Sequence, residues 1–261
     1  MTRTVRTILF LVCAVEFFFA AAFFLQWPVA VNLWPFQGTT PLTFIFVSSI
    51  FAAAAAPTLW VAVSQNYGAL AGIGLDYFSI LAPLSILSFR LGASSGNPQM
   101  TTFGLACVFG ALFGVGIFLW SARIRLDSTL PMPRLVRWSF TIFVIGLLFV
   151  GLRSILNVPN VIPWTITPEL SGVIGWTFVG AASYFVYALL RPSWLNSAGQ
   201  LLGFLAYDVV LIVPFLTRLP AAVPDVRVNL IIYTAVVIYS GSLAIYYLFL
   251  HGPTRLWAKE S

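Results

Sequence analysis

The chain has 261 residues, of which 60% are hydrophobic and only 8% are charged, and its mean hydropathy is +0.98. A soluble domain carries about 25% charged residues, so this composition excludes a largely water-facing surface and indicates a protein whose main solvent is lipid. The net charge of +6 does not point to nucleic acid, because the basic residues lie at the ends of apolar segments rather than in one basic domain.

Eight apolar segments follow one another along the chain, each close to the roughly 20 residues that a helix needs to cross a hydrocarbon core. They cover residues 7–27, 41–63, 69–91, 101–121, 137–157, 171–190, 200–219 and 229–250. Backbone groups in lipid must be satisfied within the segment, and the alternation of a membrane barrel is missing, so each segment is expected to be a helix. The fold class is therefore an all-α, polytopic integral membrane protein of about eight transmembrane helices.

The first segment admits a second interpretation, as a signal peptide. Arg3 and Arg6 precede an apolar run, as they would in such a peptide. The run, however, continues to Trp27, and Glu16 interrupts what would be its apolar core. We therefore expect this segment to be the first transmembrane helix.

The positive charges predict an orientation in the membrane. With a cytoplasmic N-terminus, nine basic residues fall on the inner side and four on the outer side. The inner set is Arg3, Arg6, Arg123, Arg125, Arg134, Arg137, Arg191, Arg255 and Lys259, and the outer set is Arg90, Arg153, Arg218 and Arg227. The expected location is the plasma (inner) membrane, with both termini cytoplasmic and with anionic lipid contacting the cytoplasmic face.

A weak internal repeat divides the chain. The Thr-Pro pair at 40–41 recurs at 167–168, which is an offset of 127 residues. An offset of 128 residues aligns Arg90 with Arg218. This pattern predicts two four-helix repeats, at 1–121 and 137–261, joined by a basic cytoplasmic linker at 122–136. Because four helices return the chain to its starting side, the repeats would be parallel, related by an axis along the membrane normal.

Three acidic residues lie inside the predicted helices: Glu16, Asp76 and Asp208. Charged groups are costly inside a bilayer and usually face a bundle interior or a cavity, so these three form the hypothetical substrate- or ion-binding site between the halves. The alternative is that each is hydrogen-bonded to a neighbouring hydroxyl, such as that of Tyr207, and only holds helices together. Asp76 and Asp208 occupy corresponding helices, but whether they align directly or one helical turn apart stays open.

Smaller patterns predict local structure. The Thr-Pro pairs are expected to start helices, and Gly110 and Gly114 to provide a face for close helix packing. Pro57, Pro83 and Pro214 lie within helices and predict kinks. Tryptophans near the outer boundary, at positions 27, 34 and 164, match an aromatic belt. Cys13 and Cys107 are expected at different depths, which argues against a disulfide between them.

Absent motifs narrow the function. The single histidine, His251, and the single lysine, Lys259, both follow the helices, so histidine-ligated haem, metal or chlorophyll and a retinal Schiff base are not expected. No nucleotide-binding or hydrolase motif occurs, and we expect no catalytic role, no cofactor and no bound nucleic acid. Two functions stay open: a carrier or binder of a small molecule or cation, and a non-catalytic structural or accessory subunit of a larger membrane complex. The expected partners are other membrane proteins or further copies of this chain. A polar cavity lined by the acids would favour the first, and a dry, closed interior the second.

Overall fold

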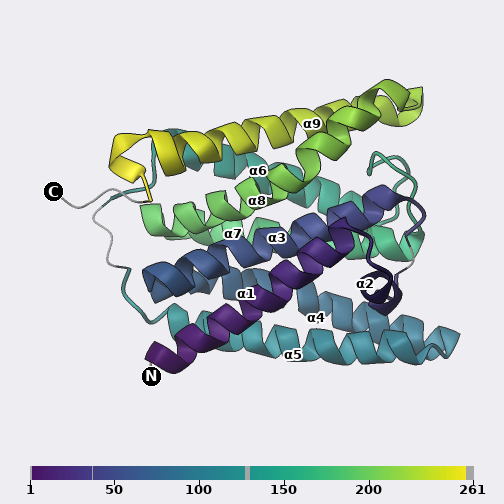
Figure 1. The fold of residues 1–261 in the computed structure, drawn as a ribbon, viewed down its shortest axis with the longest axis horizontal. Helices are drawn as coiled ribbons and strands as arrows, with labels where there is room; N and C mark the ends of the chain where they lie inside the picture. Colours follow the sequence, from purple (N-terminus) through teal and green to yellow (C-terminus); the bar gives the residue numbers. More distant parts are fainter. Residues whose placement is uncertain (1, 37, 127–129, 257–261) are drawn as a thin grey trace.

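The structure, a computed structural model, describes residues 2–36, 38–126 and 130–256, and within these it is all-helical (Figure 1). The α-helices are α1 (Thr2–Phe24), α2 (Pro28–Leu33), α3 (Pro41–Ser64), α4 (Leu70–Ser95), α5 (Pro98–Ser121), α6 (Arg134–Ile155), α7 (Pro168–Leu190), α8 (Trp194–Arg218) and α9 (Pro224–Ile245). A π-helical turn, η3 (Tyr246–Leu250), extends α9. All except α2 are long and apolar enough to cross a membrane, which confirms the eight predicted segments and is consistent with a multi-pass membrane protein.

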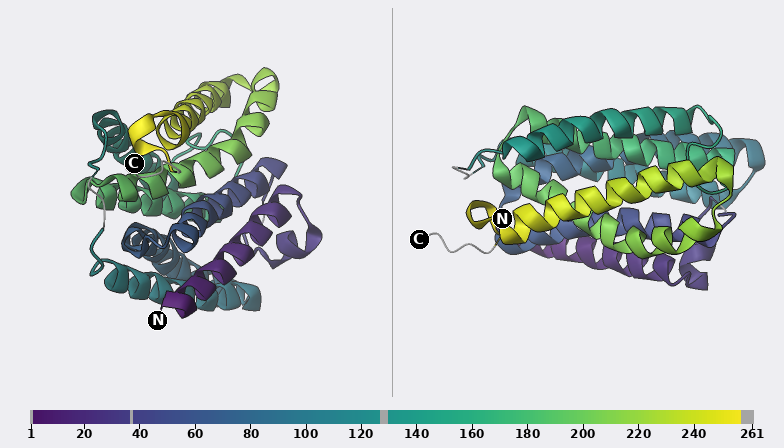
Figure 2. Two further views of the ribbon diagram at one scale, coloured as in Figure 1. Left: turned by 60° about the vertical axis from the view of Figure 1, so that its left-hand side comes forward. Right: turned by 90° about the horizontal axis from the view of Figure 1, so that it is seen from above.

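The eight long helices run back and forth between two ends of an elongated bundle (Figures 1 and 2). We call the end where α1 begins and α9 finishes the near end, and the opposite end, which carries α2, the far end. Every described arginine lies at one of these ends or in the first or last turns of a helix. The middle of the bundle, which is poor in charged residues, therefore has the length and composition that a hydrocarbon core requires.

The helices pack as two layers of four (Figure 1). In one layer α3 packs against α1 and α8, and α8 also packs against α9. In the other layer α4 packs against α5 and α7, and α7 also packs against α6. Consequently the central contacts of each layer, α3 with α8 and α4 with α7, join residues from the two halves of the chain.

Glycine pairs allow the closest helix contacts. A Cβ added to Gly114 of α5 would lie 2.7 Å from the carbonyl oxygen of Gly74 in α4, and one added to Gly175 of α7 would lie 2.7 Å from that of Gly151 in α6. Only glycine lets two backbones approach this closely. The packing face predicted at Gly114 is confirmed, whereas Gly110 faces the side chain of Leu81 rather than a backbone.

The predicted helix starts are confirmed, and the three internal prolines lie within continuous helices. Pro41 and Pro168 each occupy the first turn of their helix, where the missing amide hydrogen costs nothing. α3, α4 and α8 all continue through their internal prolines, so none of these helices is broken. α5 ends at Ser121 and α6 begins at Arg134, so the last residues of the predicted linker, 122–136, belong to α6, and its residues 127–129 lie outside the described residues.

The aromatic belt is only partly present. Trp27 is half exposed, but Trp34 and Trp164 are buried. Trp34 packs edge-on against Phe23 and Trp164 packs against Phe46, because the connections that carry these tryptophans fold over the far end of the bundle. The two cysteines are free and buried.

Candidate functional site

Glu16 of α1 is hydrogen-bonded across the bundle to α4. The hydroxyl of Tyr77 donates to Oε1 of Glu16, while Oε2 is buried with no hydrogen-bond partner among the described residues. The hydroxyl of Thr58 in α3 lies 3.4 Å from that of Tyr77, but its own proton goes to the carbonyl of Ala54 at 2.8 Å. Since a hydroxyl has one proton to give, the two donors here are fully used and the second Glu16 oxygen stays unpaired.

Asp76 precedes Tyr77 and turns toward the other half of the chain. Its Oδ1 would lie 3.1 Å from a Cβ on Gly180 of α7, so the absence of a side chain at Gly180 makes room for the carboxyl group. The carboxyl group lies within electrostatic range of Glu16 on one side and of Tyr184 on the other. Oδ1 of Asp76 and the Tyr184 hydroxyl are both buried without a hydrogen-bond partner in the described chain.

Asp208 lies apart from the other two acids. It belongs to α8 and faces α9, where its Oδ2 would be 3.4 Å from a Cβ on Gly241. The neighbouring Ser240 hydroxyl donates to the carbonyl of Val236 at 2.8 Å, and both carboxyl oxygens of Asp208 are buried without a partner among the residues described. Because α9 forms one edge of the bundle and α1 the opposite edge, the structure groups Glu16 with Asp76 only (Figure 1).

The interior around the acids is closed. A Cβ on Gly72 would fall 2.2 Å from the ring of Tyr184, and one on Gly180 would fall 2.1 Å from the side chain of Ile80. One pocket lies between α1, α4 and α5 at the near end and another along the far part of α4, and none of the three acids lines either of them. The seam between α4 and α7 is therefore packed by side chains.

Chemically, each of the two carboxyl groups beside Tyr77 can hold a proton. We name Glu16, Asp76, Tyr77, Thr58 and Tyr184 the carboxyl cluster. An intramembrane acid with unpaired oxygens is costly as a purely structural element, because an apolar side chain would fill the space without that cost. Within the described residues no group of three or more histidine, cysteine or acidic side chains is arranged to hold a metal ion.

Three members of the carboxyl cluster were not predicted from the sequence. Tyr77, Thr58 and Tyr184 join Glu16 and Asp76 from α4, α3 and α7. The available signal was weak: Tyr77 is next to Asp76, but adjacent helix residues point in different directions, and one sequence does not show which neighbour meets Glu16. Tyr207, expected as a possible hydrogen-bond partner, makes no hydrogen bond to Asp208, whose two carboxyl oxygens have no partner among the described residues.

Comparisons of the chain with protein-family models, with curated proteins and with solved structures find no match. Its class is therefore defined by the fold itself, as an all-helical chain with eight helices able to cross a membrane among the residues described. The function is argued below from the geometry of this fold.

Proposed function

We propose that the chain is a multi-pass protein of the plasma (inner) membrane with both termini in the cytoplasm. The length and hydropathy of the eight helices support insertion. The near end carries eight of the described arginines and the far end four, and the positive-inside rule therefore favours a cytoplasmic near end. Alkaline extraction of membranes, combined with reporter fusions at each terminus, tests both statements: release by alkali or an external reporter would contradict them.

The two halves, 1–121 and 137–261, are proposed to be parallel repeats. Exchanging α1, α3, α4 and α5 for α6, α7, α8 and α9 turns the contact of α1 with α3 into that of α6 with α7, and the contact of α4 with α5 into that of α8 with α9. It also turns the contact of α3 with α8 into that of α7 with α4. Every major helix contact thus has a counterpart, as two-fold pseudosymmetry requires.

Glycine contacts support a specific alignment of the repeats. We call the alignment that lays Thr40 on Thr167 the Thr-Pro register, and it relates Pro57 to Tyr184. On the third helix of each half, α4 and α8, an offset that is larger by one helical turn aligns Pro83 with Pro214 and Gly72 with Gly203. We call this second alignment the proline register. A Cβ on Gly72 would fall 2.2 Å from the Tyr184 ring, and a Cβ on Gly203 would lie 2.9 Å from the Ala53 carbonyl oxygen and 3.8 Å from the Pro57 ring.

The same alignment bears on the two aspartates. The Thr-Pro register relates Gly114 to Gly241; Gly114 packs against the Cβ of Tyr77, and Gly241 packs against that of Asp208. In the proline register Asp208 is the counterpart of Tyr77, and Tyr207 that of Asp76, so the two aspartates align one position apart. Superposition of the two halves in an experimental structure tests this register.

We further propose that the protein is a carrier or binder of protons or a small cation, acting through Glu16 and Asp76. The observation that carries this proposal is that two carboxyl groups share one electrostatic environment around Tyr77, each with a buried oxygen that has no partner in the described structure. Asp76 also lies against α7, so the cluster lies where the two halves meet. Motion of one half against the other would alter its surroundings, as alternating access requires.

Reconstituted vesicles test this function. Protein in liposomes containing a pH-sensitive dye is exposed to a Na⁺ gradient, and wild type is expected to show cation-driven proton movement that Asp76→Asn and Glu16→Gln abolish. Asp208→Asn serves as the control for a buried aspartate outside the cluster. Proton movement that is absent from wild type, or unchanged in both cluster variants, would refute the proposal.

One observation favours the second candidate, a non-catalytic accessory subunit: the seam between α4 and α7 is closed, and neither pocket described above reaches the acids. In this case the exposed apolar faces of α5 and α6, which include Phe109, Leu112, Ile142 and Phe149, would contact partner subunits. Purification from native membranes under mild detergent distinguishes the two candidates. A stoichiometric complex with other polypeptides would favour the subunit, whereas a chain that purifies alone would favour the carrier.

A further inference from the structure

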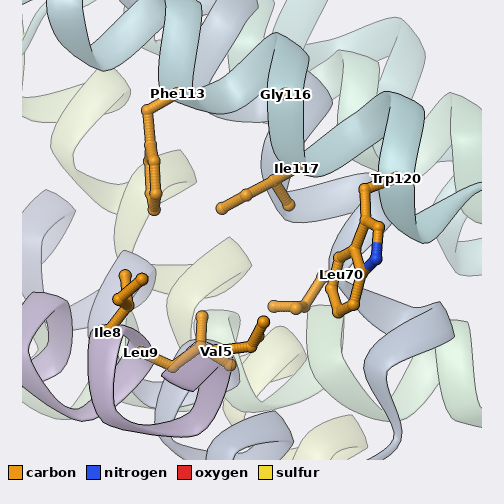
Figure 3. Close-up of a pocket in the computed structure, with 8 residues that line it drawn as sticks. All are labelled: Val5, Ile8, Leu9, Leu70, Phe113, Gly116, Ile117 and Trp120. Carbon is orange, nitrogen blue, oxygen red and sulfur yellow. The ribbon is translucent and has the colours of Figure 1, made fainter. Parts of the chain in front are cut away.

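The near end of the bundle contains an apolar groove between α1, α4 and α5 (Figure 3). Its volume is about 250 Å³, and its lining consists of Val5, Ile8, Leu9, Leu70, Phe113, Gly116, Ile117 and Trp120. The indole nitrogen of Trp120 is the one polar side-chain atom in this lining (Figure 3). From Phe113 to Trp120 the groove runs about 10 Å along α5, at about 1.5 Å per residue, which is about two thirds of one leaflet of a roughly 30 Å core.

The corresponding place in the second half is filled by the protein itself. In the two proposed registers, the counterparts of Val5, Leu9 and Leu70 are Met132, Val136 and Leu201, and all three are buried in one hydrophobic cluster. Leu9 and Leu70 are buried as well, so the halves differ at the first of these positions, where Val5 is half-buried and Met132 is buried. Gly116 of α5 corresponds to Leu243 of α9, which is buried in the same cluster. The second half thus places a leucine where the first half has a glycine.

Gly116 keeps the groove open. A Cβ added at this position would meet no atom within 4 Å, so the backbone would accept a larger residue. Leu9 and Leu70 close the inner side of the groove, and both side chains are buried. The groove is therefore an apolar recess that an elongated apolar group can fill, and its lining offers a ligand a single polar side-chain atom, the indole nitrogen of Trp120.

Basic residues lie at the same end of the bundle as the groove. Arg3 and Arg6 flank Val5 at the start of α1, and Arg123 and Arg125 follow Trp120 after the end of α5. The Nε of Arg6 is buried without a hydrogen-bond partner among the described residues. An apolar recess at the end of the bundle that carries these four arginines matches one chemistry, an acyl chain carrying an anionic headgroup.

We propose that this groove binds one acyl chain of an anionic phospholipid of the cytoplasmic leaflet, with the phosphate near Arg3, Arg6, Arg123 and Arg125. The proposal rests on the membrane insertion and orientation proposed above, but not on proton or cation binding by the acids. The bound chain takes the place that Leu243 and its neighbours occupy in the second half, and it seals α1 against α5.

The test uses the full chain in detergent, incubated with phosphatidylglycerol or with phosphatidylcholine of the same acyl chains, and native mass spectrometry of the lipid-bound fraction. Wild type is expected to retain phosphatidylglycerol at least fivefold more than phosphatidylcholine. Gly116→Leu, which copies the second half, is expected to lose that retained lipid. Gly146→Leu is the matched control, because a side chain at Gly146 of α6 also meets no atom within 4 Å and lies outside the groove.

A further variant tests whether the arginines recognise the lipid headgroup. Arg123→Gln with Arg125→Gln is expected to remove the preference for phosphatidylglycerol while leaving some lipid bound. Equal retention by the two glycine variants, or equal retention of the two lipids by wild type, would overturn the proposal. Membrane insertion would still be established separately by alkaline extraction, so failure of the lipid site is distinguishable from failure of the proposed location. A higher unfolding temperature of Gly116→Leu in lipid-free detergent would show that the variant is folded and the groove filled.

Discussion

The contact between α4 and α5 at Gly114 gives a sharp test of the helix packing. In Gly114→Ala the new methyl group would lie 2.7 Å from the carbonyl oxygen of Gly74 and 2.9 Å from the backbone nitrogen of Phe78. Both of these atoms belong to the α4 backbone, which cannot move aside as a flexible side chain can. The two helices must separate locally, and overpacking of this kind costs about 1–3 kcal/mol.

At two other glycines, substitution by alanine is expected to raise the stability of the fold instead of lowering it. Gly116→Ala and Gly146→Ala place the methyl group in open space, so they only add helix propensity, worth up to about 1 kcal/mol. Because Gly114→Ala gains the same propensity, subtracting the controls isolates the packing cost. We expect Gly114→Ala to be less stable than either control by about 1–3 kcal/mol, a factor of about 5 to 150 in the folding equilibrium.

The assay is unfolding of the purified protein in mixed micelles, at increasing mole fractions of sodium dodecyl sulfate, followed by helical circular dichroism. Gly116 lies in the groove and Gly146 outside it, so agreement between the two controls also excludes an effect of bound lipid. If Gly114→Ala is as stable as the controls, α4 and α5 are not in the close contact described, and the packing argument fails.

Three further substitutions test other contacts by the same unfolding assay. Gly175→Ala in α7, whose new methyl would lie 2.7 Å from the Gly151 carbonyl oxygen, is expected to lose about 1–3 kcal/mol relative to Gly146→Ala, and equal stability would contradict the α6–α7 contact. Tyr77→Phe removes the donor to Glu16 and is expected to cost about 1–3 kcal/mol, whereas Tyr187→Phe, whose hydroxyl has no hydrogen bond to any described residue, is expected to change stability by less than about 0.5 kcal/mol. Thr167→Ala loses the side-chain cap to the Leu170 amide and is expected to cost about 1 kcal/mol of stability. Thr40→Ala, which has no such cap to lose, is expected to cost less, and a larger loss of stability in Thr40→Ala would refute the assigned cap.

Much of the fold was predictable, because the properties that define it are local. Length and hydropathy identify a segment able to cross a membrane without reference to any other segment, and all eight predicted segments are helices in the structure. Helix starts at Pro41 and Pro168 are equally local. The short helix α2 was not predicted, since its six residues are too few for a periodic pattern.

The site was predictable only as a set of residue types. Glu16 and Asp76 are unusual inside apolar helices, and this alone marked them. Which acids meet depends on how each helix is rotated and which helices are neighbours, and a single sequence with no strong amphipathic pattern fixes neither. Asp208 therefore looked equivalent to Asp76, although it faces α9 rather than α7. The burial of Trp34 and Trp164 likewise depends on how the far-end connections fold over the bundle.

The differences between the proposed repeats bear on the proposed function more directly than their similarities do. In the Thr-Pro register the counterpart of Glu16 is Phe143, which packs against Phe185 and Phe204, and in the proline register the counterpart of Asp76 is Tyr207. The first half therefore pairs two carboxyl groups where the second half has two aromatic rings. The groove follows the same rule, since it is open in the first half and filled by side chains in the second. If two ancestral copies were alike, packing alone would favour the same apolar solution in both. Costly polar groups occur in both halves, since Asp208 of the second half is also buried with both oxygens unpartnered among the described residues. What distinguishes the first half is that Glu16 and Asp76 lie in one cluster beside the α7 face that covers Asp76, and the proposed proton or cation binding therefore uses this half.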